Sequence, residues 1–188
     1  LAADASPAAA FCVSGGGEYF AVSDDGAVRI FDATLGELKS FSVKADRIAL
    51  SDAGAPVLFY VSDGKILCRS VFGQTQAATL ALNAADFAYM RISASAGAMY
   101  FIRDKKLFRT IINFSNGEAT ASQETAVDAS FSDKATRVRV PTDENGDSVL
   151  VVQRQSGLYV NGARLRLSGL TDAVFEDGVI KLLLEENG

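Results

Sequence analysis

Histidine and tryptophan are absent from the 188 residues of this chain, which also has only two cysteines and three prolines. Without histidine, Ser-His-Asp and Cys-His catalysis and histidine-based metal sites are excluded. Two cysteines cannot form a four-thiolate zinc site. We therefore expect a protein that is not an enzyme and that has no catalytic residues, cofactor or bound metal.

The two cysteines, Cys12 and Cys68, each lie within an apolar run typical of a strand. Small secreted domains held together by disulfides use many more cysteines. We therefore expect two buried free thiols and a reducing compartment, either cytoplasmic or nuclear. A glycosylation sequon at Asn113-Phe114-Ser115 has meaning only in a secreted protein, and it leaves the secretory route open.

The chain also lacks long hydrophobic runs and a net positive charge. The longest apolar runs, such as Val57 to Val61, have the length of a strand and fall far short of the roughly 18 residues of a spanning helix. Lys and Arg number 18 against 23 Asp and Glu, and the net charge of −5 does not attract phosphate. We expect neither membrane insertion nor nucleic-acid binding, and we interpret the basic cluster Arg103 to Arg109 as a turn and the exposed face of a strand.

What the sequence does contain is a series of short apolar runs rich in Val, Ile, Phe and Tyr, separated by Gly, Asp, Asn and Ser. This composition predicts β-strands and turns. Residues 1–8 are interpreted as a flexible lead-in and residues 9–188 as the folded part. The best helical candidate, Thr75 to Tyr89, does not keep its apolar residues on one helical face, so it is predicted to form two strands around a loop.

The same order of parts, namely strand, loop, strand, polar turn and strand, recurs along the chain. Its clearest copy lies within Ser14 to Asp32, and a looser fourth copy includes a predicted strand at Ser148 to Val152. The mid-copy turns are spaced by 39, 41, 51 and 31 residues and fall at Asp24, Asp63, Asp104, Gln155 and Glu186. Their mean spacing of about 40 residues is close to the period of a four-stranded propeller blade.

We therefore predict an all-β fold, a β-propeller of four-stranded antiparallel blades, with about four blades and part of a fifth. A sheet with two apolar faces cannot bury them alone, so neighbouring sheets must stack. A β-sandwich or a solenoid is the alternative. Because closed rings usually have about six or seven blades, we expect part of a larger propeller, or an open propeller that a partner chain completes.

Residues Ser23 to Asp32 resemble a WD repeat, because a polar turn closes on Gly26 and a β run ends in an aromatic residue followed by Asp. Phe31 takes the place of the usual Trp. The Gly-His and Trp-Asp signatures are absent, and with them the histidine hydrogen-bond network of typical blades. The resemblance implies a non-enzymatic scaffold for protein-protein interaction, a WD-repeat-like subunit of a larger assembly whose partners are other proteins. Strings ending at Asp63 and Asp104 also look like other propeller families, including the secreted Tyr-Trp-Thr-Asp type.

The candidate protein-binding site consists of turn and loop residues that would line one rim: Asp25, Lys44, Asp63, Asp104, Lys105 and Gln155. Solvated turn residues without a binding role are the alternative interpretation. The aromatic residues alternate within the predicted strands, which is typical of a core, and we assign to it Tyr19, Phe59, Tyr89, Phe101 and Phe131.

The alternative function is a secreted or periplasmic propeller that binds a small molecule or Ca²⁺ through loop carboxylates. The candidate carboxylates are Asp24-Asp25, Glu185-Glu186, and Asp143, Glu144 and Asp147 in the loop Pro141 to Asp147. This loop lacks the spaced ligands and terminal Glu of a complete calcium loop, and turns favour Asp, Asn and Gly for backbone reasons. Gly15-Gly16-Gly17 is not a phosphate loop, because neither Lys nor a helix follows it. The loop from Pro141 does not repeat, so it is the first place to look for a specific function.

Overall fold

The computed structural model describes residues 10–14, 16–24, 26–51, 56–73, 77–116, 118–127, 132–143 and 145–185, and all structural statements refer to these residues. They form strands, turns and loops, and none of them belongs to a helix long and apolar enough to cross a membrane. The lead-in expected at residues 1–8 lies outside the described residues, as does Phe131.

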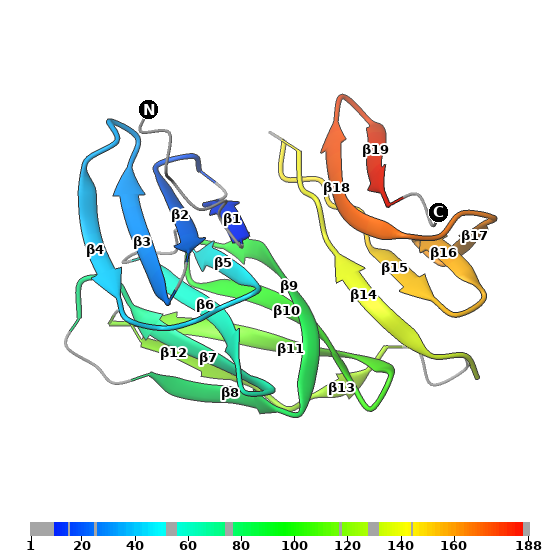
Figure 1. The fold of residues 1–188 in the computed structure, drawn as a ribbon, viewed down its shortest axis with the longest axis horizontal. Coiled ribbons are helices and arrows are strands. Elements are labelled where there is room, and N and C mark those ends of the chain that lie inside the picture. Colours follow the sequence, from blue (N-terminus) through cyan, green and yellow to red (C-terminus); the bar gives the residue numbers. More distant parts are fainter. Residues whose placement is uncertain are drawn as a thin grey trace. The chain divides into compact units, whose positions relative to one another are not determined.

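The first two sheets are four-stranded antiparallel meanders, whose strands follow one another in chain order (Figure 1). Each strand pairs with the one before it in the sequence, as in a simple up-and-down ribbon. The strands of the first sheet are β1 Ala10–Val13, β2 Tyr19–Asp24, β3 Ala27–Asp32 and β4 Glu37–Phe41. Those of the second sheet are β5 Ile48–Ser51, β6 Val57–Ser62, β7 Lys65–Ser70 and β8 Ala78–Leu82.

The remaining strands form a third and a fourth sheet and a final hairpin (Figure 1). The third sheet has the order β12-β11-β10-β9, and a short strand β13 also pairs with β11. Its strands are β9 Ala84–Ser93, β10 Ala96–Arg103, β11 Lys106–Ser115, β12 Glu118–Ala121 and β13 Thr125–Ala126. The fourth sheet consists of β14 Ala135–Arg139, β15 Val151–Arg154, β16 Gly157–Val160 and β17 Ala163–Leu165, and the hairpin of β18 Leu170–Glu176 and β19 Val179–Leu184.

The predicted four-stranded antiparallel sheets are therefore confirmed, with a fifth, short strand β13 added to the third sheet, and so are two strands within residues 75–89. The loop expected between those two strands is a single residue, Asn83, whose φ of 55° lets the chain turn directly from β8 into β9. A strand was expected from Ser148 to Val152, and the predicted start is wrong, because β15 begins at Val151. Ser148 instead forms a bridge with Thr142, and their Oγ atoms lie 2.9 Å apart.

Tight turns between the second and third strands set the register of the sheets. In the second sheet Asp63 and Gly64 have φ values of 49° and 69°, and in the third Asp104 and Lys105 have 50° and 64°. Two consecutive residues with positive φ are typical of type I′ turns, whose twist matches that of a hairpin. Two residues after each turn comes an apolar side chain that is at most 1% exposed: Val28, Ile66, Leu107 and Leu158.

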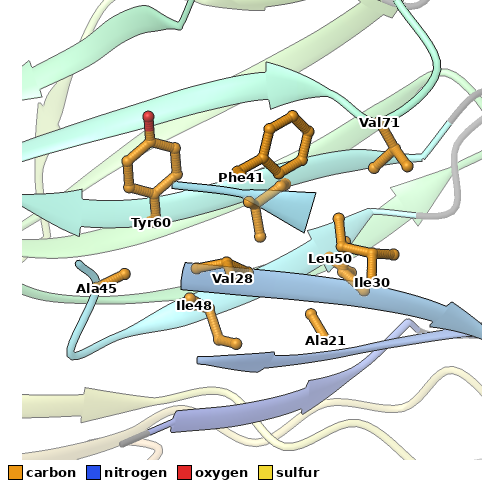
Figure 2. Packing of buried hydrophobic residues seen from close by; sticks show 10 residues of the cluster. Ala21, Val28, Ile30, Phe41, Ala45, Ile48, Leu50, Tyr60 and Val71 are labelled. Atoms are coloured by element: carbon orange, nitrogen blue, oxygen red, sulfur yellow. The ribbon is translucent and has the colours of Figure 1, made fainter. Parts of the chain in front are cut away.

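The chain divides into two compact units. Unit 1 contains Leu1–Leu82, Ser93–Ala96 and Asn113–Thr120, and unit 2 contains Asn83–Ile92, Gly97–Ile112 and Ala121–Gly188. The core of unit 1 lies between the first and second sheets. There Val28 and Ile30 of β3 pack in one cluster with Ile48 and Leu50 of β5 and Tyr60 of β6 (Figure 2).

Two clusters of apolar side chains form the core of unit 2. One joins Ile102 and Leu107 of the third sheet to Val138 and Val152 of the fourth. The other joins Leu158 of the fourth sheet to Leu170 of the hairpin. Of the aromatic residues assigned to the core, Phe59 and Phe101 are fully buried, whereas Tyr19 and Tyr89 are only half-buried.

Arg139 links the first strands of three successive repeats within unit 2. From β14, its Nη1 donates to Asp86 Oδ2 of β9 at 2.8 Å, and its Nε and Nη2 donate to the carbonyl of Thr171 in β18 at 3.1 and 2.7 Å. The side chains of Arg139 and Asp86 are 10% and 11% exposed. An ion pair this buried is costly to break on one side, because the remaining charge is left without a partner.

Replacing Arg139 with Met is expected to lower the free energy of unfolding by about 3 kcal/mol, because the buried Asp86 then loses its ion pair with Arg139. Urea denaturation at pH 7 measures the change. The matched control is Lys181→Ala, which breaks the solvent-exposed pair between Lys181 and Glu176 and should leave stability almost unchanged. Equal losses in the two variants would show that Arg139 does not hold the strands together.

Candidate interaction site

The predicted rim residues that the structure describes all occupy turns or connections and are exposed. Asp63, Asp104, Lys105 and Gln155 lie in turns between the second and third strands of their sheets, and Lys44 lies between β4 and β5. Asp25 falls outside the described residues. In an up-and-down meander, the middle turn and the segment that leaves the fourth strand lie at the same end of the sheet. Each described rim residue is therefore at the corresponding end of its own sheet.

Unit 2 brings two of these turns together through the segment before β14. The backbone N–H of Ala135 donates to the carbonyl of Lys105 at 2.8 Å, and the N–H of Gln155 donates to the carbonyl of Lys134 at 2.9 Å. Lys105 and Gln155 therefore belong to one continuous surface. In unit 1, by contrast, no hydrogen bond or ion pair between described side chains joins Lys44 to Asp63.

A polar cluster that the sequence reasoning missed lies at this surface. Asp133 Oδ2 accepts from the backbone N–H of Ser156 at 3.2 Å and also from the Ser156 hydroxyl. That hydroxyl lies 2.9 Å from Tyr159 Oη, and Arg154 Nη1 donates to the Asp133 carbonyl at 3.2 Å. The cluster joins the segment that enters the fourth sheet to the sheet's middle turn. The sequence signal that could have revealed this cluster was the charged residue Asp133 shortly before a predicted strand, together with the polar turn at Gln155.

The cluster keeps Asp133 ionised. The hydrogen bond from the Ser156 hydroxyl is the main cause that lowers the pKa of the Asp133 carboxyl, and the Ser156 N–H and the Arg154 guanidinium add to it. Hydrogen bonds to a carboxylate stabilise its charged form. The turn at Gln155 is therefore held by a charged acceptor at neutral pH.

Replacing Asp133 with Asn is expected to destabilise the protein by about 1 kcal/mol at pH 7, because hydrogen bonds to a charged acceptor are lost. The folded-state pKa of Asp133 lies below its unfolded value, so this contribution is complete above the unfolded pKa and disappears as the pH falls through the folded pKa. Chemical denaturation from pH 7 to pH 2 should show the two stability curves converging at the acid end. A constant difference across that range would contradict the role of the ionised carboxylate.

Other loop carboxylates accept hydrogen bonds from residues of the turn in which they lie. Asp32 Oδ1 accepts from the Thr34 hydroxyl at 2.6 Å, from the Thr34 N–H at 2.9 Å and from the Gly36 N–H at 3.0 Å. The Thr34 hydroxyl is the main reason that the pKa of Asp32 is lowered. The aspartate that ends the WD-like run therefore shapes the entry into β4. Of the predicted carboxylate pairs, Asp24 pairs with Arg29 at 3.2 Å and Glu185 with Arg137 at 3.9 Å.

The loop Pro141 to Asp147 is organised in the same way. Asp143 Oδ1 accepts from the backbone N–H groups of Asn145 at 3.0 Å and Asp147 at 2.9 Å. Glu144 lies outside the described residues. In the described part of the chain, no group of three or more Cys, Asp or Glu side chains is placed to hold a metal ion. The described contacts of Asp143 are those of an Asx turn.

The two thiols are free and poorly suited to act as nucleophiles. Burial raises the pKa of Cys12 to about 12 and that of Cys68 to about 11, because the thiolate loses its hydration. Cys12 lies on β1 and Cys68 on β7, in different sheets of unit 1. Both thiols are therefore protonated at neutral pH.

The native chain is expected to react with Ellman's reagent at pH 8 at least about a hundredfold more slowly than the chain unfolded in urea, because little thiolate is present in the fold. The absorbance of released thionitrobenzoate measures both rates. A native rate equal to the unfolded rate would mean that the thiols are solvated.

No protein-family model matches the chain, and no curated protein matches its sequence. Solved structures match its fold. Hsv2 of Kluyveromyces marxianus has a TM-score of 0.55 and 8% identity, with 96% of this chain and 70% of that chain covered. The WD40 domain of SCAP from fission yeast has a TM-score of 0.52 and 11% identity, with 93% and 47% covered. TolB from Acinetobacter baumannii has a TM-score of 0.51 and 14% identity, with 93% and 43% covered.

These similarities and the four-stranded meanders define the class: the chain has a β-propeller fold, as predicted. At 8 to 14% identity the likeness shows the fold alone. The chain spans less than half the length of the SCAP and TolB chains that it matches.

Proposed function

We propose that this chain is a non-enzymatic scaffold for protein-protein interaction, and that it works as a WD-repeat-like subunit of a larger assembly. The fold supports the class. The observation that carries the proposal is an apolar face of the first sheet that the described chain leaves uncovered. Exposed apolar surfaces of this kind mark sites where proteins bind one another.

The uncovered face follows from strand alternation in the first sheet. One face carries Ala21, Val28 and Ile30, which are buried in the core of unit 1. The opposite face carries Phe11 and Val13, which are 60% and 52% exposed. The sheet thus has two apolar faces, and the described residues of unit 1 cover only one of them.

Three phenylalanine rings form a row on the uncovered face. The ring centroids of Phe11 and Phe20 lie 6.1 Å apart, and those of Phe20 and Phe31 lie 5.0 Å apart with the rings stacked. Phe31 is the residue in the place of the WD-repeat Trp. An aromatic row on a flat sheet offers a large contact area with little loss of side-chain entropy, which favours binding.

The hairpin β18–β19 in unit 2 has a second face of this kind. Val174, Val179 and Leu183 are 54%, 57% and 61% exposed, whereas Phe175 and Ile180 pack inward. Asp172, Glu176 and Lys181 share the outer face with them. Both faces suit a partner of one chemistry, an apolar sheet surface of the kind that adjacent blades present to one another. Further sheets of a larger propeller, or a partner chain that completes this one, fit that description.

The test uses the tagged 188-residue chain as bait in an extract of its own source, followed by cross-linking and quantitative mass spectrometry. The wild-type chain should retain a stoichiometric protein partner. The double variant Phe11→Ser/Val13→Thr should weaken that interaction about tenfold or more, because central apolar contacts dominate interface energies.

The matched control is Leu35→Ser. Leu35 is 74% exposed, lies in the turn between β3 and β4 and is not a member of the aromatic row, so its replacement should leave the partner bound. A wild-type chain that stays monomeric and retains no protein, or a double variant that binds as well as Leu35→Ser, would overturn the proposal.

We place this scaffold in the cytoplasm or nucleus, which the two free thiols in separate sheets support. A secreted or periplasmic propeller that binds a small molecule or Ca²⁺ through loop carboxylates has support only from the fold likeness to TolB. The described contacts of the carboxylates at Asp143 and Asp147 do not favour it, because Asp143 already accepts two backbone N–H groups.

A further inference from the structure

A cavity of about 310 Å³ opens on the third sheet within unit 2. Its polar wall comes from Tyr100 of β10, Arg109 of β11, and Gln123 and Thr125 on the segment that includes β13. Ile111 and Leu150 contribute apolar side chains to the wall. The volume is at the lower end of the range of about 300 to 1,000 Å³ that is typical of small-molecule sites.

Arg109 is the unusual group in this cavity. Its Nε is buried and has no hydrogen-bond partner. Within the part of the chain that the structure describes, no carboxylate pairs with its guanidinium, and its one ring contact is with Tyr100, with Cζ 5.8 Å from the ring centroid. A buried guanidinium nitrogen without a partner is costly, and a nearby ring does not replace a hydrogen-bond acceptor.

A second arginine of the same sheet, Arg103 at the end of β10, has a carboxylate as its ion-pair partner. Arg103 Nη2 lies 2.6 Å from Glu124 Oε2, and its Cζ lies 4.4 Å from the ring centroid of Phe108. Phe108 and Arg109 are neighbours in β11, so their side chains point to opposite faces of the sheet. One face thus has a paired arginine and the other has an arginine facing a cavity.

Strand pairing holds Arg109 in place. β13 pairs with β11 in a register that sets Thr125 directly opposite Arg109, so both side chains lie on the same face. The backbone N–H of Val127 donates to the carbonyl of Leu107 at 3.0 Å, which extends this pairing. The backbone hydrogen bonds therefore fix the Cα positions of Arg109 and Thr125 next to each other, with both side chains on the face that carries the cavity.

The chemistry of the walls defines the ligand. A guanidinium presents a planar fork of donors that matches the two oxygens of a carboxylate. The apolar walls at Ile111 and Leu150 favour a short hydrocarbon group next to that carboxylate. The net charge of −5 disfavours polyanions, so a single negative charge is the better match.

We propose that this cavity binds a carboxylate carried on a short apolar group, with Arg109 as its anchor and with Gln123 and Thr125 as further hydrogen-bond partners. The carboxylate comes either from a free short-chain acid or from an acidic residue of a peptide. The proposal does not depend on the scaffold function, because the cavity and the aromatic row belong to different units.

The experiment follows the side-chain Nε–H signal of Arg109 by ¹H–¹⁵N NMR in the full chain, with Arg109→Lys used to assign it. The probes are hexanoate, the peptide acetyl-Leu-Glu-Leu-amide, its Gln counterpart and inorganic phosphate. Hexanoate and the Glu peptide should shift the signal in a saturable way, and the Gln peptide should not. A stronger response to hexanoate supports the free acid, and a stronger response to the Glu peptide supports the acidic residue.

Three variants complete the test. Arg109→Lys keeps the charge but loses the fork, and should weaken binding, followed on the backbone amides, about tenfold or more. Gln123→Glu places a carboxylate at an exposed position of the wall and should weaken binding by a similar factor without disturbing the fold. Arg103→Lys is the matched control and should bind like the wild type.

Four outcomes would overturn the proposal. The first is no shift with either carboxylate probe, and the second is a response to phosphate as strong as that to hexanoate. The third is an Arg109→Lys variant that binds like the wild type. The fourth is a Gln123→Glu variant that binds like the wild type.

Discussion

A four-stranded sheet with apolar side chains on both faces needs a neighbour on each face, and most of this structure follows from that constraint. In the first sheet, Val28 and Ile30 are covered by the second sheet, while Phe11 on the opposite face remains exposed. The hairpin of β18 and β19 is covered on the side of Phe175 and open on the side of Leu183. The surfaces best suited to binding are the same kind of surface that elsewhere makes the core.

Apolar packing alone does not specify how neighbouring sheets join. Hydrogen bonds and ion pairs of polar side chains add that specificity. Arg139 reaches from the fourth sheet to Asp86 and to the carbonyl of Thr171, and so fixes three strands with one guanidinium. Asp133 and Ser156 connect the segment entering the fourth sheet to its middle turn. The absence of histidine removes the usual hydrogen-bond network of WD repeats, but it does not leave the fourth sheet without a polar connection.

The sequence was enough to predict most of the strands and turns, because local rules determine them, but not the start of β15 or the short strand β13. Asp63-Gly64 and Asp104-Lys105 form turns with positive φ, and the alternating apolar residues fix which face is buried. The sites were harder to predict, because their partners lie far apart in the sequence. Asp86 and Arg139 are 53 residues apart, and no local pattern relates them. Topology alone places the described rim residues at corresponding ends of their own sheets, and their role in binding stays a prediction.

For the basic cluster Arg103 to Arg109, the sequence predicts the secondary structure but not the environment of each arginine. A turn followed by a strand is correct for these residues, as the turn at Asp104 and strand β11 demonstrate. The strand assignment alone, however, treats both arginines as solvated charges. Their environments differ because Glu124 and Thr125 return to the same sheet on opposite faces, which gives Arg103 a carboxylate and Arg109 a hydroxyl beside a cavity. Adjacent positions on one returning segment therefore decide which arginine is structural and which is available to a ligand.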